Sequence, residues 1–449
     1  MMSVQDAATM LKGEASGGNP VFNGVSTDTR TVRSGELFVA LRGEKFDGHE
    51  FLEQAKKSGA VAAMVDRGFT AKPALPVVVV QDTKLALGSL AKGWRSRFQP
   101  ALVALTGSNG KTTVKEMLAA ILRCHAGEKA VLATAGNLNN EIGLPLTLLR
   151  LREAHRCCAI ELGMNHKGEI AYLADIAAPT VALVNNAQRE HLEFMNSVEE
   201  VAAENASVYA ALPAHGVAVI NADDAHAAFF RKAAGKRRVV DFGLEQKALV
   251  SGGYALKGLT SEIDLRTPAG EAHATLAIPG LHNVRNALAA AACAFAVGIK
   301  EKIIAEGLSA FRPYTGRLQV KTATGGATVI DDTYNANPDS VRAAIDVLAA
   351  CPAPTVLVLG DMGEVGDKGS DFHREVGAYA RQKKISSLLA LGEATRHAAE
   401  AFGSGGRHFD SVEALLPAIQ GRSILVKGSR FMRMERVVAA LTGTTTGGH

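Results

Sequence analysis

The amino-acid sequence predicts an α/β protein of three domains. At 449 residues the chain has about three times the length of an average domain. Short apolar segments alternate along it with longer helical stretches, a pattern typical of mostly parallel sheets. Hydrophobic residues make up 47% of the chain, which is enough for a buried core in each domain.

The first predicted domain, residues 1–98, is a small α/β domain. Apolar runs at 36–41 and 77–80 predict strands. Helices are expected over 50–58 and 84–95. The alternation therefore begins close to the N-terminus.

The second predicted domain, residues 99–312, is built on a mostly parallel sheet. An apolar run at 102–105 leads into a glycine-containing loop at 106–113, and a helical run follows the loop. Alternating short segments within 248–278 have no helices between them, which predicts an antiparallel edge, and a helix is expected at 283–297. Further strands are predicted at 157–162, 181–184, 217–220 and 238–242.

The third predicted domain, residues 313–449, begins within a linker at 311–316. Strands and helices alternate again, so we expect a small doubly wound, Rossmann-like sheet. The expected strands are 328–331, 355–359, 387–391 and 423–426, and the expected helices are 338–349 and 370–383.

The loop at 106–113 carries the strongest chemical signal. A strand, a glycine loop and a helix form the setting in which backbone N–H groups bind phosphate, so the central domain is predicted to be of P-loop type and to bind ATP. Lys111 can reach the terminal phosphates, and the Thr112 hydroxyl can ligate Mg²⁺. Leu105 stands where the general pattern requires glycine, so the loop is a shorter variant; the alternative is a tight turn with a solvated lysine. The predicted phosphate loop comprises Thr106, Gly107, Ser108, Asn109, Gly110, Lys111, Thr112 and Thr113.

Two polar residues follow neighbouring strands of the central domain. Glu161 ends the strand at 157–162, and the carboxyl ends of parallel strands meet where ligands bind. Its carboxylate is therefore a candidate Mg²⁺ ligand, and the alternative is a glutamate that caps a helix or forms an ion pair. His191 follows the strand at 181–184 and is a candidate for a second metal or for phosphate, although a lone histidine is more often structural.

Amide-rich and acidic loops suggest a second substrate site. Asn139 and Asn140 lie in an amide-rich segment that either orients a polar substrate or is only a turn cluster. In the third domain, polar loops follow three predicted strands and should meet at one face, opposite the ATP loop across a cleft. These loops are 331–338, 360–364 and 427–430.

Composition and charge exclude several classes of protein. The net charge is +4, from 49 basic and 45 acidic residues, without a basic block, so no nucleic-acid partner is expected. The five cysteines show no Cys-x-x-Cys spacing, which is typical of reduced thiols in the cytoplasm. No signal peptide or long apolar segment is evident, so we expect a cytoplasmic monomer that does not insert into membranes.

In several of these stretches the chain resembles the Mur ligases, which build the peptide of bacterial cell-wall precursors. The phosphate loop is the first, and it is joined by 139–145, 190–192, 280–286 and 316–317. The stretches 332–338 and 359–364 resemble the branch of the family that adds D-alanyl-D-alanine to UDP-N-acetylmuramoyl-tripeptide. The Asp-Asn-Pro-Arg or Asp-Asn-Pro-Lys signature of the branch that adds diaminopimelate or lysine is absent from the sequence.

The resemblance implies an ATP-dependent ligase with ATP and Mg²⁺ as cofactors. ATP would phosphorylate the terminal carboxylate of the UDP-linked tripeptide, and the amine of D-alanyl-D-alanine would attack the acyl phosphate. The domains would close and exclude water. The resemblance assigns catalysis to Lys111, Glu161, His191 and Arg317, and Mg²⁺ binding to Thr112, Glu161 and His191. It assigns ATP binding to Asn283, Asn286, Arg317 and Asp332 beside the phosphate loop. It assigns substrate binding to Ser26, Thr27, Asp28, Arg30, Asp47 and His49 in the first domain, and to Asn139, Asn140, Tyr334, Asn335 and Asn337 elsewhere.

One position departs from the family pattern. Family members commonly carry a lysine downstream of the His191 motif, and its carbamate helps to hold a second Mg²⁺. That position falls on Asn205, and no lysine lies between Lys167 and Lys232. We hypothesise that Asn205, with Glu204 or water, takes the place of the carbamate.

Two other interpretations compete with this one. Another ligase of the same fold, such as folylpolyglutamate synthase, is disfavoured because the N-terminal segment resembles the part of the Mur ligase substrate site that binds the uridine nucleotide. A nucleotide-driven switch is disfavoured by the amide-rich loops and the third domain, because a switch needs no second small-molecule site.

Overall fold

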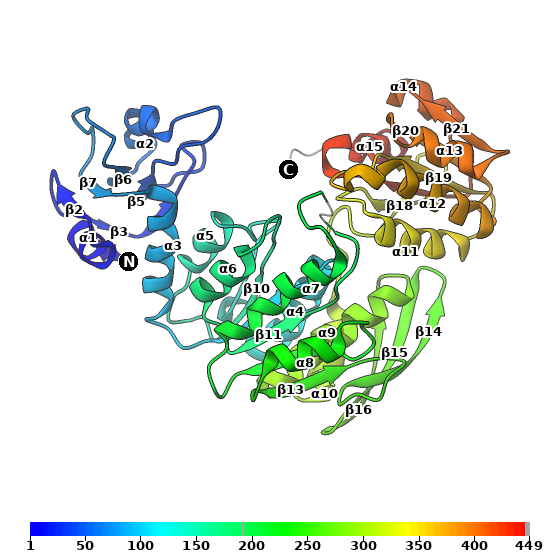
Figure 1. The fold of residues 1–449 in the computed structure, drawn as a ribbon, viewed down its shortest axis with the longest axis horizontal. Coiled ribbons are helices and arrows are strands. Elements are labelled where there is room, and N and C mark those ends of the chain that lie inside the picture. Colours follow the sequence, from blue (N-terminus) through cyan, green and yellow to red (C-terminus); the bar gives the residue numbers. More distant parts are fainter. Residues whose placement is uncertain (191–192, 445–449) are drawn as a thin grey trace.

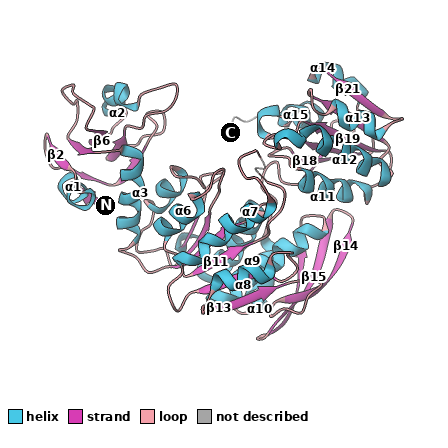
Figure 2. Ribbon diagram, in the orientation of Figure 1, coloured by secondary structure: helices cyan, strands magenta, loops and turns pink. Residues whose placement is uncertain are grey.

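The computed structural model describes residues 1–190 and 193–444. An N-terminal, a central and a C-terminal unit, each built on its own sheet, follow one another along the chain. The N-terminal and C-terminal units lie apart from each other, on either side of the central unit (Figure 1). Helices and strands alternate in all of them (Figure 2), which confirms the predicted α/β class. The domain boundaries after residues 98 and 312 stay predictions.

The N-terminal unit is a small sheet in the order β2-β7-β6-β5-β4. The parallel strands are β4 (Gly24–Ser26), β5 (Glu36–Val39), β6 (Ala62–Asp66) and β7 (Val77–Val80), and β2 (Glu14–Ser16) is antiparallel. β1 (Met2–Ser3) pairs separately with β3 (Val21–Phe22), and the helices are α1 (Val4–Leu11), α2 (Leu52–Lys57) and α3 (Thr83–Arg95). Helix α3 begins where the Asp82 carboxylate accepts the Leu85 N–H.

The central sheet is parallel throughout, in the order β13-β12-β11-β8-β10-β9. Its strands are β8 (Ala101–Thr106), β9 (Val131–Ala133), β10 (Cys157–Glu161), β11 (Val181–Val184), β12 (Val217–Asn221) and β13 (Arg238–Phe242). Its helices are α4 (Lys111–Ala126), α5 (Gly143–Leu148), α6 (Glu169–Ala177), α7 (Val198–Ala206), α8 (Ala227–Ala234), α9 (Leu281–Val297) and α10 (Glu301–Ala310).

Both faces of the central sheet are buried, because its strands are apolar on alternate sides. Val103 and Leu105 of β8 pack into the core shared with α4, α9 and α10, whereas Leu102 and Ala104 pack into the core shared with α5 to α8. The second core also includes residues of α3, so it joins the central unit to the N-terminal unit.

The segment after the central sheet corrects one expectation. The strands β14 (Ser251–Lys257), β15 (Thr260–Thr267) and β16 (Gly270–Leu276) form a separate antiparallel sheet and not an edge of the central one. One isolated bridge, between Phe242 and Val250, links it to β13. Ile263 and Leu265 are buried in the core shared with α9 and α10. This three-stranded sheet therefore packs on those helices and does not continue the central sheet beyond β13.

The C-terminal sheet has the order β17-β18-β22-β19-β20-β21, with only β17 antiparallel among its described strands. Its strands are β17 (Gln319–Thr322), β18 (Thr328–Asp332), β19 (Thr355–Gly360), β20 (Ser387–Leu391), β21 (Gly406–Phe409) and β22 (Ser423–Lys427). Its helices are α11 (Pro338–Ala349), α12 (Gly369–Gln382), α13 (Arg396–Phe402), α14 (Val412–Leu415) and α15 (Glu435–Thr442). Residues of α11 to α13 join one core and those of α14 and α15 another, as a doubly wound fold requires.

Among residues 1–190 and 193–444, no helix combines the length and the apolar character that a bilayer span requires.

Candidate active site

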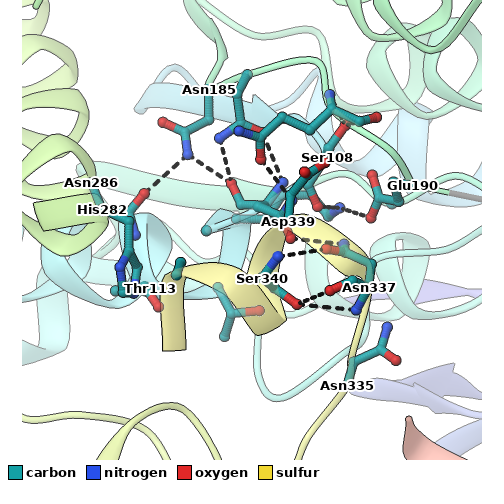
Figure 3. Close-up of a pocket in the computed structure, with 18 of the residues that line it drawn as sticks. Ser108, Thr113, Asn185, Glu190, His282, Asn286, Asn335, Asn337, Asp339 and Ser340 are labelled. Carbon is teal, nitrogen blue, oxygen red and sulfur yellow. Dashed lines mark hydrogen bonds and ion pairs between the residues drawn. The ribbon is translucent and has the colours of Figure 1, made fainter. Parts of the chain in front are cut away.

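A cavity of about 980 Å³ lies between the central and C-terminal units. Its walls are loops that follow the carboxyl ends of β8, β10, β11 and β12 on one side and of β18 and β22 on the other. In such sheets ligands bind at these ends. Figure 3 shows Ser108 and Glu190 of the central unit close to Asn337 and Ser340 at the start of α11.

The loop between β8 and α4 has the geometry of an anion site. Gly107 and Gly110 have φ values of +133° and +82°, which L side chains rarely adopt. A Cβ atom at Gly110 would lie 2.3 Å from Asn286 Oδ1, so only glycine fits there. No side chain of the described residues caps the start of α4, so its first N–H groups are available to a phosphate at the cavity wall.

Lys111 lies at the first position of α4 and its ammonium group folds over the loop. Its Nζ donates to the carbonyl oxygens of Gly107 at 2.6 Å and Ser108 at 3.2 Å, and to Glu190 Oε1 at 2.7 Å. The Lys111 side chain is 14% exposed, so this charge is held close to the loop at the cavity wall. A cation in this position suits the terminal phosphates of a nucleotide.

Glu161 ends β10 and offers an unused oxygen to the cavity. Its Oε1 accepts from Thr112 Oγ1 at 3.3 Å and from Asn139 Nδ2 at 2.8 Å. Its Oε2 is buried and has no hydrogen-bond partner among the described residues. A buried carboxylate oxygen without a partner is costly unless a cation binds it, so Glu161 and the adjacent Thr112 hydroxyl fit Mg²⁺.

The fit to a metal rests on these two groups and not on a ligand cluster. Across residues 1–190 and 193–444, no group of three or more histidine, cysteine, aspartate or glutamate side chains is placed to hold a metal. The predicted ligand His191 lies outside the described residues.

An amide network lines the wall formed by α9. Asn185 Nδ2 donates to Asn286 Oδ1 at 3.1 Å, and Asn286 Nδ2 donates to Asn283 Oδ1 at 3.1 Å. Burial, with Lys427 nearby, lowers the pKa of His282 to about 4. Neutral His282 can therefore accept from Asn283 Nδ2 at 3.1 Å, and the wall presents uncharged donors and acceptors that suit a nucleobase.

The C-terminal unit reaches the phosphate loop through two side chains. Arg317 donates to Thr112 Oγ1 at 3.4 Å, and its guanidinium group lies over the Tyr334 ring at 3.9 Å. Asn337, the N-cap of α11, donates to Asn109 Oδ1 at 2.9 Å. The predicted residues Arg317, Tyr334, Asn335 and Asn337 thus line the same cavity as the loop.

Asp332 is held by a buried ion pair behind these residues. Its Oδ2 accepts from Lys427 Nζ at 2.6 Å, and Lys427 also donates to the Asn335 carbonyl at 2.8 Å. Burial raises the pKa of Asp332, and the adjacent Lys427 opposes this shift. The pair anchors the loop after β18 to the end of β22.

Not every predicted residue of the phosphate loop faces the cavity. Ser108, Asn109, Gly110, Lys111, Thr112 and Thr113 line it, together with Asn139, Asn140 and Glu161. Thr106 and Gly107 lie behind this wall. The Thr106 hydroxyl is buried and donates to Asn205 Oδ1 at 2.6 Å.

Comparison with known proteins identifies the family of this chain. Three family models match it: "Mur ligase family, catalytic domain" at residues 21–95, "Mur ligase middle domain" at 105–294 and "Mur ligase, glutamate ligase domain" at 316–430. The UDP-N-acetylmuramoyl-tripeptide–D-alanyl-D-alanine ligase of Escherichia coli (strain K12) is 40% identical, over 98% of each chain. The chain belongs to the Mur ligase family. The ligase of the same name from Haemophilus influenzae is 41% identical, over 93% of each chain.

Solved Mur ligase structures have the same architecture. A crystal structure of MurF from Acinetobacter baumannii is 34% identical and superposes with a TM-score of 0.92, over 99% of each chain. The MurF ligase of Thermotoga maritima, solved in complex with ADP, is 25% identical with a TM-score of 0.82, over 94% of this chain and 98% of that one.

The predicted residues of the N-terminal unit of this Mur ligase lie away from the cavity. Ser26 ends β4, and Asp28 forms an ion pair with the exposed Arg30 at 2.6 Å. Asp47 and His49 follow β5, which is the parallel neighbour of β4, so both groups lie at one sheet edge. Thr27 lies in the first of these loops.

His49 is more constrained than the sequence suggested. Its Nδ1 lies 2.6 Å from Asp47 Oδ1, and its Nε2 accepts the Asp66 N–H at 3.1 Å. Its ring stacks on Phe69 and is buried. Both ring nitrogens are therefore engaged within the N-terminal unit.

The hypothesis that Asn205 replaces a metal-binding carbamate stays a prediction, because His191 of the same metal site lies outside the described residues. Asn205 is fully buried on α7, its Oδ1 accepts from Thr106, and its Nδ2 donates to the Val201 carbonyl at 3.0 Å. Neighbouring Glu204 accepts the N–H groups of Gly168 at 2.9 Å and Ile170 at 2.8 Å at the start of α6. Both side chains stabilise the fold, and neither lines the cavity.

Several cavity residues were not singled out as site residues from the sequence. They share one feature, because each follows the carboxyl end of a parallel strand or lies in the first turn of α9 or α11. Applying that rule to β12 as strictly as to β10 would have found Asp223 and Asp224. Among the residues missed are Asn185, Asn186, Gln188, Glu190, Asn221, Asp223, Asp224, His282, Arg285, Asp339, Ser340 and Lys427.

Proposed function

We propose that this chain is the ATP-dependent ligase that joins D-alanyl-D-alanine to UDP-N-acetylmuramoyl-tripeptide, releasing ADP and phosphate. The observation that carries the proposal is the single cavity in which the phosphate loop of one unit meets Arg317 and Asn337 of another. The named relatives and the ADP complex of the Thermotoga enzyme support it. The reaction would be a cytoplasmic step of peptidoglycan precursor synthesis.

The chemistry explains why two units must meet. A carboxylate resists attack by an amine because oxide is a poor leaving group, whereas an acyl phosphate releases phosphate. Lys111 and Arg317 stabilise the negative charge that develops on the transferred phosphoryl group. Thr112 and Glu161 would hold Mg²⁺, which when bound neutralises charge on the nucleotide phosphates. The walls of the cavity align the carboxylate with the amine and keep water away from the acyl phosphate.

Each unit has a role in this proposal. The N-terminal unit binds the UDP end of the tripeptide substrate through Ser26, Thr27, Asp28 and Arg30, with Asp47 and His49 shaping the adjacent loop. The amide wall of Asn283 and Asn286 binds the adenine. Tyr334, Asn335 and Asn337 position the dipeptide, and Asp332 with Lys427 supports them. Asn139 and Asn140 orient the reacting end of the tripeptide.

An ADP-release assay tests the proposal. We expect ADP only when ATP, UDP-N-acetylmuramoyl-tripeptide and D-alanyl-D-alanine are all present, with a mass-spectrometric product equal to their condensation. Steady ATP hydrolysis without the dipeptide would instead indicate a nucleotide switch and would contradict the proposal.

Lys111→Ala provides the matched test of the site. It removes the cation at the loop, so we expect turnover to fall by about 10³-fold or more. Lys115→Ala lies one turn further along α4, outside the cavity lining, and should retain far more activity in the folded fraction. Near-normal turnover in Lys111→Ala would remove this lysine from the mechanism.

A further inference from the structure

The segment Gln188–Glu190 contacts two units at once. It follows β11, and its successive side chains point in different directions. Gln188 and Glu190 contact the phosphate loop, whereas Arg189 between them contacts the C-terminal unit. The sequence motifs of the chain assign no role to Arg189.

On the phosphate-loop side, the contacts are short. The Ser108 hydroxyl donates to the Gln188 carbonyl at 3.2 Å, and the Gln188 N–H donates back to Ser108 Oγ at 2.9 Å. Asn109 Nδ2 donates to Gln188 Oε1 at 2.7 Å, and Glu190 binds Lys111. The segment is therefore attached to the loop on both sides of Arg189.

On the other side, Arg189 binds two carboxylates of two helices. Its Nε lies 3.1 Å and its Nη2 2.5 Å from Asp339 Oδ1 on α11, and its Nη1 lies 2.7 Å from Glu375 Oε2 on α12. Its backbone N–H also donates to Asp339 Oδ2 at 3.1 Å, and its guanidinium group lies 5.2 Å from the centre of the Phe372 ring. The hydrogen bonds that Arg189 donates to Glu375 and Asp339 hold the pKa of its guanidinium group above its ordinary value.

The position of Asp339 gives this contact its consequence. Asp339 lies in the first turn of α11, two residues after Asn337, whose side chain donates to Asn109 of the phosphate loop. Fixing Asp339 therefore fixes the end of α11 that enters the cavity. The side chains of Arg189 and Asp339 are each 25% exposed and that of Glu375 is 32% exposed, so the ion pairs are partly shielded from water.

We infer that Arg189 is a positioning residue that clasps the C-terminal unit over the phosphate loop through Asp339 and Glu375. The inference rests on the proposed function for its kinetic consequence, but not for its structural one. A bidentate guanidinium group between two carboxylates holds both position and orientation, which a single lysine charge does not. Losing it lowers the fraction of molecules in which Arg317 and Asn337 reach the loop.

A lower fraction of molecules in the closed arrangement has defined effects on KM and kcat. Substrates that bind the closed arrangement must then also draw the C-terminal unit into place, so their apparent dissociation constants rise by the inverse of the closed fraction. At saturation the closed arrangement is restored. KM therefore rises while kcat changes little, unlike the loss of a residue that touches the reacting atoms.

The experiment compares Arg189→Ala with Arg342→Ala. Arg342 binds the same Glu375 at 3.1 Å and stacks on Tyr379, but all these groups belong to the C-terminal unit, so its loss leaves the clasp in place. Small-angle X-ray scattering without substrates should show a larger radius of gyration for Arg189→Ala than for the wild type or Arg342→Ala. KM for ATP and for both other substrates should rise roughly tenfold in Arg189→Ala only, with kcat changed less than about threefold.

Two further variants sharpen the test. Arg189→Lys keeps the positive charge but loses the bidentate guanidinium geometry. Its radius of gyration and its KM values should therefore lie between those of the wild type and of Arg189→Ala. Asp339→Asn should expand the molecule like Arg189→Ala, and the double variant should add little, because both changes break one contact.

The possible results separate the clasp from the proposed activity. Wild-type scattering in Arg189→Ala, or equal expansion in Arg342→Ala, would overturn the inference. So would a raised KM without expansion. Scattering needs no substrate, so a failure of the ligase assay in the wild-type protein leaves the structural test of the clasp intact.

Discussion

Glu161 is a cavity residue whose burial carries an evident cost. It is buried at the end of β10, yet one of its carboxylate oxygens has no hydrogen-bond partner among the described residues. Such an arrangement destabilises a protein unless a ligand compensates for it. The cost at this position is therefore itself evidence for a cation at the cavity wall.

Glu161→Gln should separate stability from function. The glutamine Oε1 can still accept from Thr112 and Asn139, while the uncompensated charge disappears, so the free energy of unfolding should stay equal or increase. The Mg²⁺ concentration for half-maximal ADP release should rise about tenfold or more, because the site loses its charged ligand. Titration of Mg²⁺ in the assay measures this.

Glu169→Gln is the matched control for that titration. Glu169 also lines the cavity, but its carboxylate already accepts the N–H groups of Asn165 at 2.6 Å and His166 at 3.1 Å. Its Mg²⁺ dependence should remain that of the wild type. Equal Mg²⁺ curves for both variants would argue against a metal at Glu161.

At the scale of elements, a buried amide docks helix α7 onto strand β8. Asn205 connects the Thr106 hydroxyl at the end of β8 to the Val201 carbonyl one turn earlier in α7. At the position where the family pattern carries a lysine, this chain therefore has an asparagine that joins a helix to a strand. The residue type alone did not reveal this, because an asparagine suits either a polar cavity or a buried hydrogen bond.

Asn205→Ala should destabilise the protein by about 2 kcal/mol, because it leaves the buried Thr106 hydroxyl without its partner. Urea unfolding measures the difference. Asn196→Ala, which removes an exposed contact to Glu200 just before the same helix, should change stability by less than about 0.5 kcal/mol. A shift in Mg²⁺ dependence without loss of stability would support the metal-site hypothesis.

Helix α12 fixes the loop after β19 through a neutral histidine. His373 is buried, its Nδ1 donates to the Gly369 carbonyl at 2.6 Å, and its Nε2 accepts the Met362 N–H at 3.0 Å. If Nε2 were protonated, its N–H and the Met362 N–H would be two donors facing each other, and the hydrogen bond would be lost. Burial accordingly lowers the pKa of His373 below the ordinary value of 6.5.

This pKa makes stability depend on pH in a defined direction. Well above pH 6.5 His373 is neutral in both the folded and the unfolded protein and contributes no pH dependence. As the pH falls below that value, the unfolded protein binds the proton first, so stability is lost at up to about 1.4 kcal/mol per pH unit. Urea unfolding at several pH values below 6.5 should show that the free energy of unfolding falls less steeply with decreasing pH in His373→Gln than in the wild type. Parallel curves for variant and wild type would contradict the assignment.

At the scale of the whole molecule, a shared apolar core spans each of the two junctions between units. The N-terminal unit joins the central one through a continuous core in which α3 packs on α5 and α6. Trp94, the only tryptophan of the chain, donates there to the Leu151 carbonyl at 3.1 Å. Arg95 beside it donates to the carbonyls of Ala177, Phe98 and Ala178. The C-terminal unit shares an apolar core with the central unit, and around the candidate active site polar side chains also join the two units.

Arg95→Leu should loosen the N-terminal junction. It leaves three carbonyl oxygens without their donor, so the free energy of unfolding should fall by about 3 kcal/mol, and the Trp94 fluorescence midpoint in urea should fall with it. Arg97→Leu removes an exposed guanidinium group that lies 5.2 Å from the same ring, and should cost less than about 1 kcal/mol. Similar midpoints for the two variants would contradict a junction held by Arg95.

The sequence by itself determined the alternation of strands and helices, the phosphate loop and the family. Strand and helix periodicities and the turn at Gly107 and Gly110 are local properties, so they can be recognised within a few residues of one another. It missed α13 and β21, and it placed the meander at 251–276 on the wrong sheet, because the partner of an edge strand is not a local property.

Only the tertiary structure decided which polar groups share a site. Lys111 meets Glu190, and Arg189 meets Asp339 150 positions away, because separate strand ends and helix starts converge at one cavity. The same packing buried Asn205 and engaged both nitrogens of His49. Residue type states what a side chain can bind, but burial and the orientation of whole units decide what it does bind.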